Sequence, residues 1–391
     1  MSVMDVLRSV IEELAPIPRL PTSKGEQAAA YVVRDRLKDH GCRAEVEAVR
    51  AYSSYAYPIG LLSTVGVLSA VASLRGRRVW GAIGGAAATA GIVDDITGSA
   101  MVCRRMAMRP RTSYNVVAET GDLTASRTLV VLAHHDAAPS GYVFDPSLTD
   151  WLADRRPDLV EAMKSNPPLW WPVIAGPALT ALGSITGSRA LRWAGLIAAL
   201  GSLAAMVDIG RRPAVPGAND NLSGVAVLVA LAETLSRKPL SGLRVLLVSA
   251  GAEEALQEGI RGFARNHFGR LPAESTWFLN VDTVGSGRLV LLEGEGPVRM
   301  HDYDREFKDF VSRCAADNDI PLLRGLRSRN STDGSVPRRH GYRTATVVSV
   351  DGRKLLPHYH LDSDLPEHVD YGCVANAAKL VESVARTLAS S

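Results

Sequence analysis

The second half of the chain alternates short apolar runs with helical patterns, and this alternation constrains the fold most strongly. Buried strands read as short continuous apolar runs, whereas an amphipathic helix repeats its apolar residues every three to four positions. The strand-like runs cover residues 243–250, 275–282, 287–294 and 344–350, and the helical patterns cover 221–238 and 306–318. Strands that alternate with helices predict an α/β fold, with a mostly parallel central sheet and helices on its two faces.

The beginning of the chain fits the same kind of domain. Ser23 is followed three residues later by Glu26, the pattern of a capping box, and a helix should run from there to Gly41. Residues 42–49 then alternate apolar and polar positions, as a half-buried strand does. Two more strands are predicted at 114–119 and 128–133.

Length, charge and cysteine content limit the functions that the chain can have. Its 391 residues suffice for one large or two ordinary domains. The formal net charge of +3 comes without a long basic run, so nucleic acid is not an expected partner. The four cysteines form no CxxC pair, which argues against a disulfide framework and a cysteine zinc site. This cysteine usage fits a reducing compartment.

Two stretches interrupt the α/β pattern with uncharged apolar runs. The runs are 55–74 and 79–93 in the first stretch, and 166–188 and 193–207 in the second. The first run of each pair reaches the roughly 20 residues that a spanning helix needs, and the second run is shorter. We therefore divide the chain into an α/β domain (1–52, 112–141 and 214–391) and two apolar helical hairpin insertions (53–111 and 142–213).

The apolar runs predict membrane association. They are rich in small residues, which allow close helix contact, and Trp170, Trp171 and Trp193 stand near run ends. A soluble helical subdomain, a lid or a homodimer surface is the alternative. The start of the chain lacks the basic and apolar regions of a signal peptide, so a cytoplasmic location is expected otherwise. Arginines stand both in the hairpin turns and in the outer flanks, and the topology is therefore open.

The run TLVVLAHHDAAPSG ends in residues that can bind a metal. Side chains alternate along a strand, so His134 and Asp136 share one side and His135 points the other way. A carboxylate often accepts the second N–H of a metal-bound imidazole, which suits Asp136 behind His134. His135 is expected to tolerate substitution. Taken alone, the pattern also fits an ordinary histidine at the end of a strand.

Other strand ends carry similar groups. Glu253 and Glu254 follow one predicted strand, Asp282 ends another, and Asp220 lies in a glycine-rich turn before a helix. A late segment, LPHYHLDSD, offers His358 and His360. Each residue alone is normal in a cap or turn. Together they supply the mixed nitrogen and oxygen ligands that Zn²⁺ or a similar divalent ion prefers.

The order of these motifs, AHHD, PGANDN, AEE, NVD and YH, resembles zinc metallopeptidase family 28, the bacterial leucyl aminopeptidase and aminopeptidase Y type. The resemblance covers residues 1–50, 112–141 and 214–391. Two positions depart from the family pattern: Asn219 stands where an aspartate is frequent, and Leu361 replaces a threonine, although the trailing Asp364 fits. A segment around Asp333 loosely matches a late substrate-side motif.

The resemblance implies a two-zinc aminopeptidase acting on peptides. Asp220 would bridge the two ions, and its bond to Asn221 would be a cis peptide. The implied ligands and catalytic groups are His134 and Asp282 at one zinc, Glu254 and His360 at the other, Glu253 as general base, and Asp136 behind His134. Such a site hydrolyses its substrate directly, without a covalent intermediate.

Other functions of the same fold stay open. Carboxypeptidases and glutaminyl cyclases occur in this family, although cyclases usually use one zinc and the full ligand set argues against that chemistry. A catalytically inactive, membrane-associated scaffold protein is the alternative from a different class. The filled ligand positions argue against it.

Overall fold

An eight-stranded mixed sheet forms the centre of the protein, whose structure is a computed structural model that describes residues 2–391. The strand order is β1-β2-β4-β3-β5-β10-β6-β9, and β7 pairs with β8 in a separate small ladder. The strands are β1 (Arg43–Ala51), β2 (Arg111–Gly121), β3 (Thr128–His134), β4 (Arg244–Ala250), β5 (Thr276–Val281), β6 (Arg288–Leu291), β7 (Gly294–Glu295), β8 (His301–Asp302), β9 (Leu322–Leu323) and β10 (Arg343–Val350).

The four central strands β4, β3, β5 and β10 are parallel, so their carboxyl ends meet at one edge of the sheet. Strands β1 and β2 continue the sheet antiparallel on one side, and β6 pairs antiparallel with β10 on the other. The predicted α/β class with a mostly parallel sheet is confirmed.

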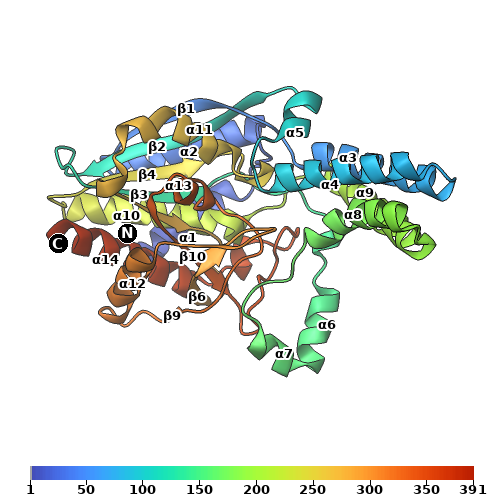
Figure 1. Cartoon of the computed structure of the whole chain (residues 1–391). Coiled ribbons are helices and arrows are strands. Elements are labelled where there is room, and N and C mark those ends of the chain that lie inside the picture. The colour runs from blue at the N-terminus through green and yellow to red at the C-terminus, as the bar shows by residue number, and fades with distance from the viewer. Residues whose placement is uncertain (1) are drawn as a thin grey trace.

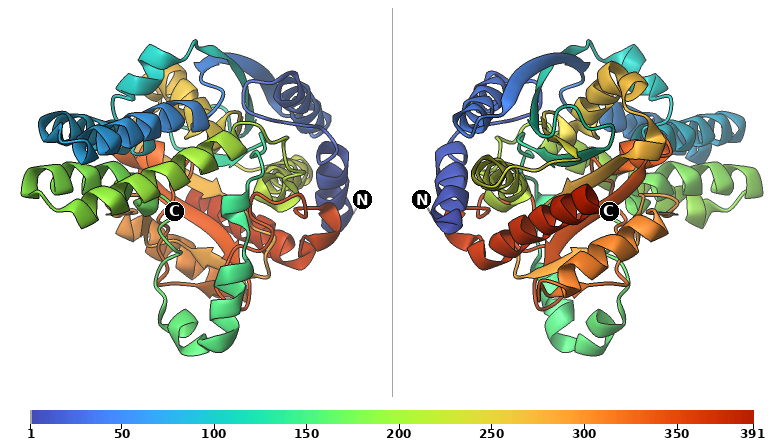
Figure 2. Two further views of the ribbon diagram at one scale, coloured as in Figure 1. Left: turned by 90° about the vertical axis from the view of Figure 1, so that its right-hand side faces the viewer. Right: turned by 90° about the vertical axis from the view of Figure 1, so that its left-hand side faces the viewer.

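Helices cover both faces of this sheet (Figures 1 and 2). One face packs against α1 (Val3–Leu14), α2 (Lys24–Asp39), α10 (Ser223–Arg237), α12 (Arg305–Ala316) and α14 (Tyr371–Ser390). The other face packs against α11 (Glu258–His267) and α13 (Ser335–Arg339). Along β3, Val131 belongs to the first core and Leu132 to the second. This strand is buried on both faces, which explains its continuous apolar sequence.

The predicted helix after Ser23 forms, but its capping box is only half made. The Ser23 hydroxyl accepts the N–H of Glu26, as predicted. The Glu26 side chain does not return the bond; it is buried and accepts a hydrogen bond from Ser113 instead. The helix ends at Asp39, and Gly41 follows with a positive φ of 80°.

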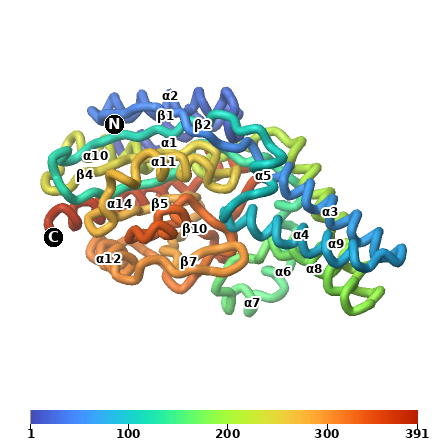
Figure 3. The backbone as a smooth tube through the Cα atoms, turned by 45° about the horizontal axis from the view of Figure 1, so that its top comes forward, coloured from blue at the N-terminus to red at the C-terminus, as the bar shows by residue number. Residues whose placement is uncertain are grey.

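The apolar runs form a four-helix bundle that projects from one end of the sheet (Figures 1 and 3). Its helices are α3 (Ala56–Leu74), α4 (Arg78–Ile96), α8 (Trp171–Thr186) and α9 (Arg189–Ile209), and they pack in the cyclic order α3-α4-α8-α9.

The lengths of these helices differ from those expected. The run 166–188 was predicted to be long enough to span, but its helix begins only at Trp171 and has 16 residues. The run 193–207 was predicted to be short, yet α9 starts at Arg189 and has 21 residues. By length and composition alone, α3 and α9 are the two described helices that are able to cross a membrane.

The remaining elements connect these parts. Short helices α5 (Val102–Ala107), α6 (Ser147–Arg155) and α7 (Pro157–Ala162) flank the bundle segments in the chain. Single helical turns complete the structure: η1 (Tyr142–Phe144), η2 (Ala218–Leu222), η3 (Glu253–Ala255), η4 (Phe268–Arg270), η5 (Ala273–Ser275) and η6 (Pro366–His368).

Candidate metal centre and active site

The structure brings the predicted ligands together at the carboxyl edge of the parallel strands. His134 ends β3, Asp282 follows β5, and Glu254 lies in η3 just after β4. Asp220 lies in η2 before α10, and His360 lies in the loop after β10. All five side chains are buried. The parallel sheet therefore brings the five side chains together, which the order of the motifs only suggested.

Asp220 stands between the two histidines. Its Oδ1 lies 3.4 Å from His134 Nε2, and its Oδ2 lies 3.5 Å from His360 Nε2. Glu254 Oε2 lies 3.2 Å from the same His360 nitrogen. Two ligands at zinc-binding distance from one tetrahedral ion are about 3.3 Å apart, and these separations fit that spacing.

Unpartnered polar atoms support a cation at this place. The three ligand atoms that His134, Asp220 and Glu254 offer all lie within 4.8 Å of one another. Glu254 Oε1 and His360 Nδ1 are buried without a hydrogen-bond partner among the described residues. Buried polar groups without partners are costly unless an ion or water satisfies them.

Asp282 lies on the His134 side of the cluster. The Thr283 hydroxyl joins it to Asp220, since its Oγ1 lies 2.9 Å from Asp282 Oδ1 and 3.3 Å from Asp220 Oδ1. Burial raises the pKa of Asp282 to about 6. His358 lies outside the cluster, because its Nδ1 contacts Ser363 Oγ at 2.8 Å.

The turn that carries Asp220 is held by side chains from elsewhere in the fold. The Asp220–Asn221 peptide is cis, as the resemblance implies. Both oxygens of Asp364 accept backbone N–H groups, from Asn219 at 2.8 Å and from Asp220 at 3.0 Å. The Asn221 side chain accepts the N–H of Thr283 at 3.0 Å and thereby ties the turn to the end of β5.

Asp136 contacts more than the histidine behind which it was predicted. Its Oδ1 lies 3.4 Å from His134 Nδ1, which fits the expected contact. Its two oxygens also accept the backbone N–H groups of Glu253 and Glu254, each at 3.0 Å. Asp136 therefore positions the turn that carries both glutamates. Sequence reasoning missed this contact because it joins two different strand ends.

His135 points away from the cluster, as predicted, but the expectation that it tolerates substitution does not agree with its surroundings. The side chain is fully buried, and its Nδ1 contacts Ser249 Oγ at 2.9 Å. Its carbonyl accepts a hydrogen bond from Arg19 Nε at 2.8 Å. A residue packed in this way is expected to be sensitive to changes in size and polarity.

The buried cluster attracts positive charge. Burial by itself lowers the pKa of His360, but the charge of Glu254 and the contact with Asp220 raise it to about 10. Burial raises the pKa of Asp220, yet its contacts with His134 and His360 lower that pKa below its ordinary value. A bound cation takes the place of such protons, because carboxylates bind metals in their charged form and imidazoles in their neutral form.

Glu253 is suited to exchange a proton. Burial raises the pKa of its carboxyl well above the ordinary value. The Gln257 amide donates to Glu253 Oε1 at 3.0 Å and also to the Ser331 carbonyl at 2.9 Å, which fixes the orientation of the carboxylate. Asp333 is a further buried acid, and neither of its oxygens has a hydrogen-bond partner among the described residues. The sequence signals this residue only through the loose motif around it.

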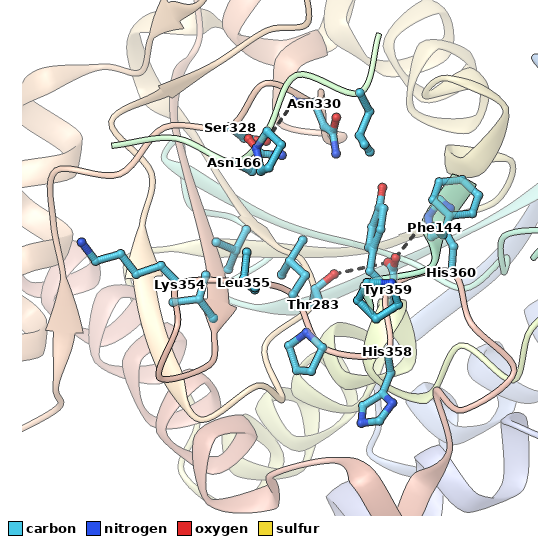
Figure 4. A pocket seen from close by; sticks show the side chains of 18 of the residues that line it. Phe144, Asn166, Thr283, Ser328, Asn330, Lys354, Leu355, His358, Tyr359 and His360 are labelled. Carbon is cyan, nitrogen blue, oxygen red and sulfur yellow. Dashed lines mark hydrogen bonds and ion pairs between the residues drawn. The ribbon is translucent and has the colours of Figure 1, made fainter. Parts of the chain in front are cut away.

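A cavity of about 580 Å³ opens onto the cluster, and His134, Asp220, Glu253, Glu254, Asp282 and His360 are among the residues that line it. Figure 4 shows Tyr359 and His360 at this cavity, with Phe144 beside His360. The ring centroids of Phe144 and His360 are 4.5 Å apart. Phe144 comes from the second insertion, so this insertion contributes a wall of the cavity. No pattern in the sequence pointed to that contact.

Comparison with known proteins agrees with this geometry. The sequence profile of peptidase family M28 matches residues 204–385. No curated protein sequence matches the chain. Among solved structures, the chain is similar to a glutaminyl cyclase from Bacteroides thetaiotaomicron (14% identity, TM-score 0.59), covering 98% of this chain and 97% of that one.

Two other similar structures are described as peptidases. A leucine aminopeptidase precursor from the same organism has 14% identity and a TM-score of 0.58, with 98% and 96% of the two chains covered. A Zn-dependent exopeptidase from Parabacteroides distasonis has 13% identity and a TM-score of 0.56, with 98% and 97% covered. At these identities the structural likeness shows the fold. Residues 204–385 thus match the profile of peptidase family M28, and the chain as a whole has the fold of that family's exopeptidases.

Proposed function

We propose that the protein is a metal-dependent aminopeptidase that removes N-terminal residues from peptides. The observation that carries the proposal is the position of Asp220, which presents one oxygen to His134 and the other to His360. Such a carboxylate is suited to bridge two ions. The similarity to a leucine aminopeptidase precursor supports the choice of aminopeptidase.

The donor set fits two zinc ions. His134 and Asp282 would hold one ion, Glu254 and His360 the other, and Asp220 both. Bound zinc supplies Lewis acidity, which polarises a carbonyl and makes water more acidic. Similar divalent ions accept the same nitrogen and oxygen ligands.

The protein's own groups would move the proton. Glu253 would accept a proton from the attacking water and deliver it to the amine that leaves. Gln257 keeps the carboxylate in position. Asp136 holds the backbone of the same turn. Water attacks the carbonyl directly, so no covalent intermediate with the protein is needed.

The direct test combines metal analysis with a panel of aminoacyl amides. The wild type should bind about two metals per chain, and Glu253→Gln should bind the same number but lose turnover by a factor of about 10² to 10⁴, the typical contribution of a general base. Glu26→Gln is the matched control, since Glu26 is another buried glutamate and does not line the cavity. Full turnover in Glu253→Gln would exclude the proposed role of this carboxylate.

The substrate panel also distinguishes the other functions of the fold. It should include peptides with N-terminal glutamine, because a glutaminyl cyclase is among the similar structures. Cyclisation without hydrolysis would replace the aminopeptidase proposal with cyclase activity. Cleavage of N-blocked peptides from their C-terminus would identify a carboxypeptidase. A metal-loaded wild type without turnover on any member of the panel would favour an inactive scaffold.

A further inference from the structure

The bundle of α3, α4, α8 and α9 buries many small and polar residues and exposes many large apolar ones, although next to the α/β body it also buries large side chains such as Ile59, Leu62 and Ile92. Its buried positions include Ser69, Ser73, Gly85, Thr180, Ser184 and Gly195. Its exposed positions include Leu61, Leu68, Ile83, Ile185, Ile197 and Leu200. A helical bundle in water has the opposite arrangement, with an apolar stripe inside and charged residues outside.

The small residues bring the helix backbones into contact. A Cβ on Gly85 would lie 2.8 Å from the Pro177 carbonyl oxygen, and one on Gly195 would lie 2.7 Å from the Thr180 nitrogen. The hydroxyls of Ser73 and Ser184 share a hydrogen bond of 2.7 Å inside the bundle. Small residues at the contact and hydroxyl hydrogen bonds between helices are typical of helices that associate in lipid, where apolar burial gives no driving force.

The exposed apolar side chains surround the bundle. Leu68 on α3 is 63% exposed, Ile185 on α8 is 70% exposed and Ile197 on α9 is 67% exposed. Ile83 adds an exposed side chain from α4. Exposed apolar surface of this extent indicates an interaction site. A single protein partner covers one side of a bundle, whereas a lipid bilayer covers every side.

The lengths and charges of the bundle match a bilayer. The 19 residues of α3 span about 28 Å, close to the roughly 30 Å of a hydrocarbon core. Residues 56–93 and 166–207 contain no Asp or Glu. Their only charged residues are arginines in or next to the two hairpin turns at the tip: Arg75, Arg77, Arg78, Arg189 and Arg192. These charges complement the phosphates of lipid headgroups.

Aromatic residues stand at both ends of the uncharged zone. Trp80 and Trp193 are exposed near the tip, and Tyr57 and Trp171 are exposed near the α/β body. Aromatic side chains gather at the two interfaces of a membrane in the same way. This pattern has no reason to occur on a protein–protein surface, where aromatic residues concentrate at the centre of the contact.

We propose that the four-helix bundle is embedded in a lipid bilayer and anchors the α/β body to one side of it. Both hairpins leave the body and return to it, so every segment of the sheet stays on the same side (Figure 1). The ligand cluster lies at the root of the bundle. A smaller cavity of about 100 Å³ is lined both by Val173 and Met206 of the bundle and by Glu254 and His360 of the cluster. The site therefore opens near the membrane surface.

Flotation with lipid vesicles tests the anchor without using enzymatic activity, so its outcome is independent of the proposed function. The full chain, purified in detergent, is reconstituted with vesicles of phosphatidylcholine and phosphatidylglycerol and washed with alkaline carbonate. The wild type should float with the vesicles and resist the wash. The variant Leu68→Asp/Ile197→Asp should float at least about 100-fold less, because each aspartate near the middle of a span is strongly disfavoured in a bilayer.

The control variant, Met4→Asp/Leu123→Asp, replaces apolar residues of the α/β body that are 42% and 36% exposed and should float like the wild type. If the bundle variant fails to fold, quenching of tryptophan fluorescence by brominated lipids decides. The wild type should be quenched, and Trp80→Phe/Trp193→Phe should be quenched clearly less, with Trp171 at the other interface accounting for the remainder. A wild type that is soluble without detergent, as a monomer or as an oligomer that the bundle variant dissociates, overturns the proposal. Flotation without quenching also overturns it, because it indicates attachment at the surface only.

Discussion

At the scale of single residues, buried charged groups hold the backbone segments that carry the site residues. Arg19 is fully buried and donates to the carbonyls of Leu14 at 2.8 Å, His135 at 2.8 Å and Pro216 at 2.8 Å. One guanidinium thus joins the end of α1, the end of β3 and the segment before the Asp220 turn. Its five donors satisfy backbone groups that would otherwise be buried without partners. The sequence around Arg19 contains no motif that reveals this role.

Glu26 makes stability depend on pH in a direction that is unusual for an acid. Burial, and next the charge of Asp136, raise its pKa to about 8 from the ordinary value of 4.5. Between these two values the folded protein keeps a proton that the unfolded chain releases, so the free energy of unfolding falls as pH rises through this window. Below pH 4.5 both states hold the proton, and the free energy of unfolding no longer depends on the titration of Glu26.

Glu26→Gln removes this titration. The free energy of unfolding of the variant, relative to that of the wild type, should rise between pH 5 and pH 8 by about 2 kcal/mol or more, since one pKa unit corresponds to about 1.4 kcal/mol. Urea unfolding of both proteins at several pH values measures the difference. A difference that does not change with pH would show that Glu26 is already ionised in the folded protein.

At the scale of elements, a buried ion pair connects the root of the bundle to the site. Arg104 of α5 and Asp95 of α4 are both fully buried, with Nη2 and Oδ2 2.8 Å apart. Arg104 also donates to the carbonyl of Ala255, in the turn that carries both site glutamates. The bundle and the turn that carries Glu253 and Glu254 are therefore held together by one guanidinium.

Removing one partner of this ion pair should lower the free energy of unfolding more than replacing both partners with apolar residues. Arg104→Met should lower the free energy of unfolding by about 3–5 kcal/mol, because it leaves Asp95 buried without its partner. The double variant Arg104→Met/Asp95→Leu should recover much of this loss. Denaturant unfolding in a constant detergent background measures both variants. Equal losses in the single and double variants would contradict this account.

At the scale of the whole molecule, a peptidase fold carries a second layer of structure that extends from the carboxyl edge of its sheet, where the ligand cluster lies. The insertions leave the sheet intact because they enter at its carboxyl edge, where loops are free to lengthen. One insertion then contributes Phe144 to the wall of the cavity. The site is therefore assembled from the sheet, from the loop after β10 and from an insertion.

Metal binding should stabilise this assembly as a whole. Ions that bind only the folded state each add about 2.7 kcal/mol at a concentration 100 times their dissociation constant. Zinc added to the metal-free protein should therefore raise the melting temperature by roughly 5–10 °C, and a chelator should reverse the change. Calorimetry measures the shift, and Asp220→Ala should abolish most of it. A melting temperature that ignores zinc in the wild type would contradict the metal centre.

The sequence by itself determined the fold class and the set of candidate ligand types. Apolar runs such as 243–250 specify buried strands because burial on both faces leaves no place for polar residues. The motifs at the strand ends were readable because acidic and imidazole groups next to such strands are costly without a cation. The tertiary structure alone decided which groups face each other: that Asp136 holds the glutamate turn, that Asp364 holds the Asp220 turn, and that His135 is locked in the core. These contacts join residues far apart in the chain, and local sequence patterns carry no record of them.

The same division holds for the insertions. Their apolar composition was readable from the sequence, but which side chains lie inside and which outside was not, because all four helices are apolar around most of their circumference. Only their packing shows which small residues, such as Ser69, Gly85 and Gly195, face inward and which large ones, such as Leu68 and Ile197, face outward. Which side chains face inward depends on how closely the helix backbones approach one another, and this distance is set only in the assembled bundle.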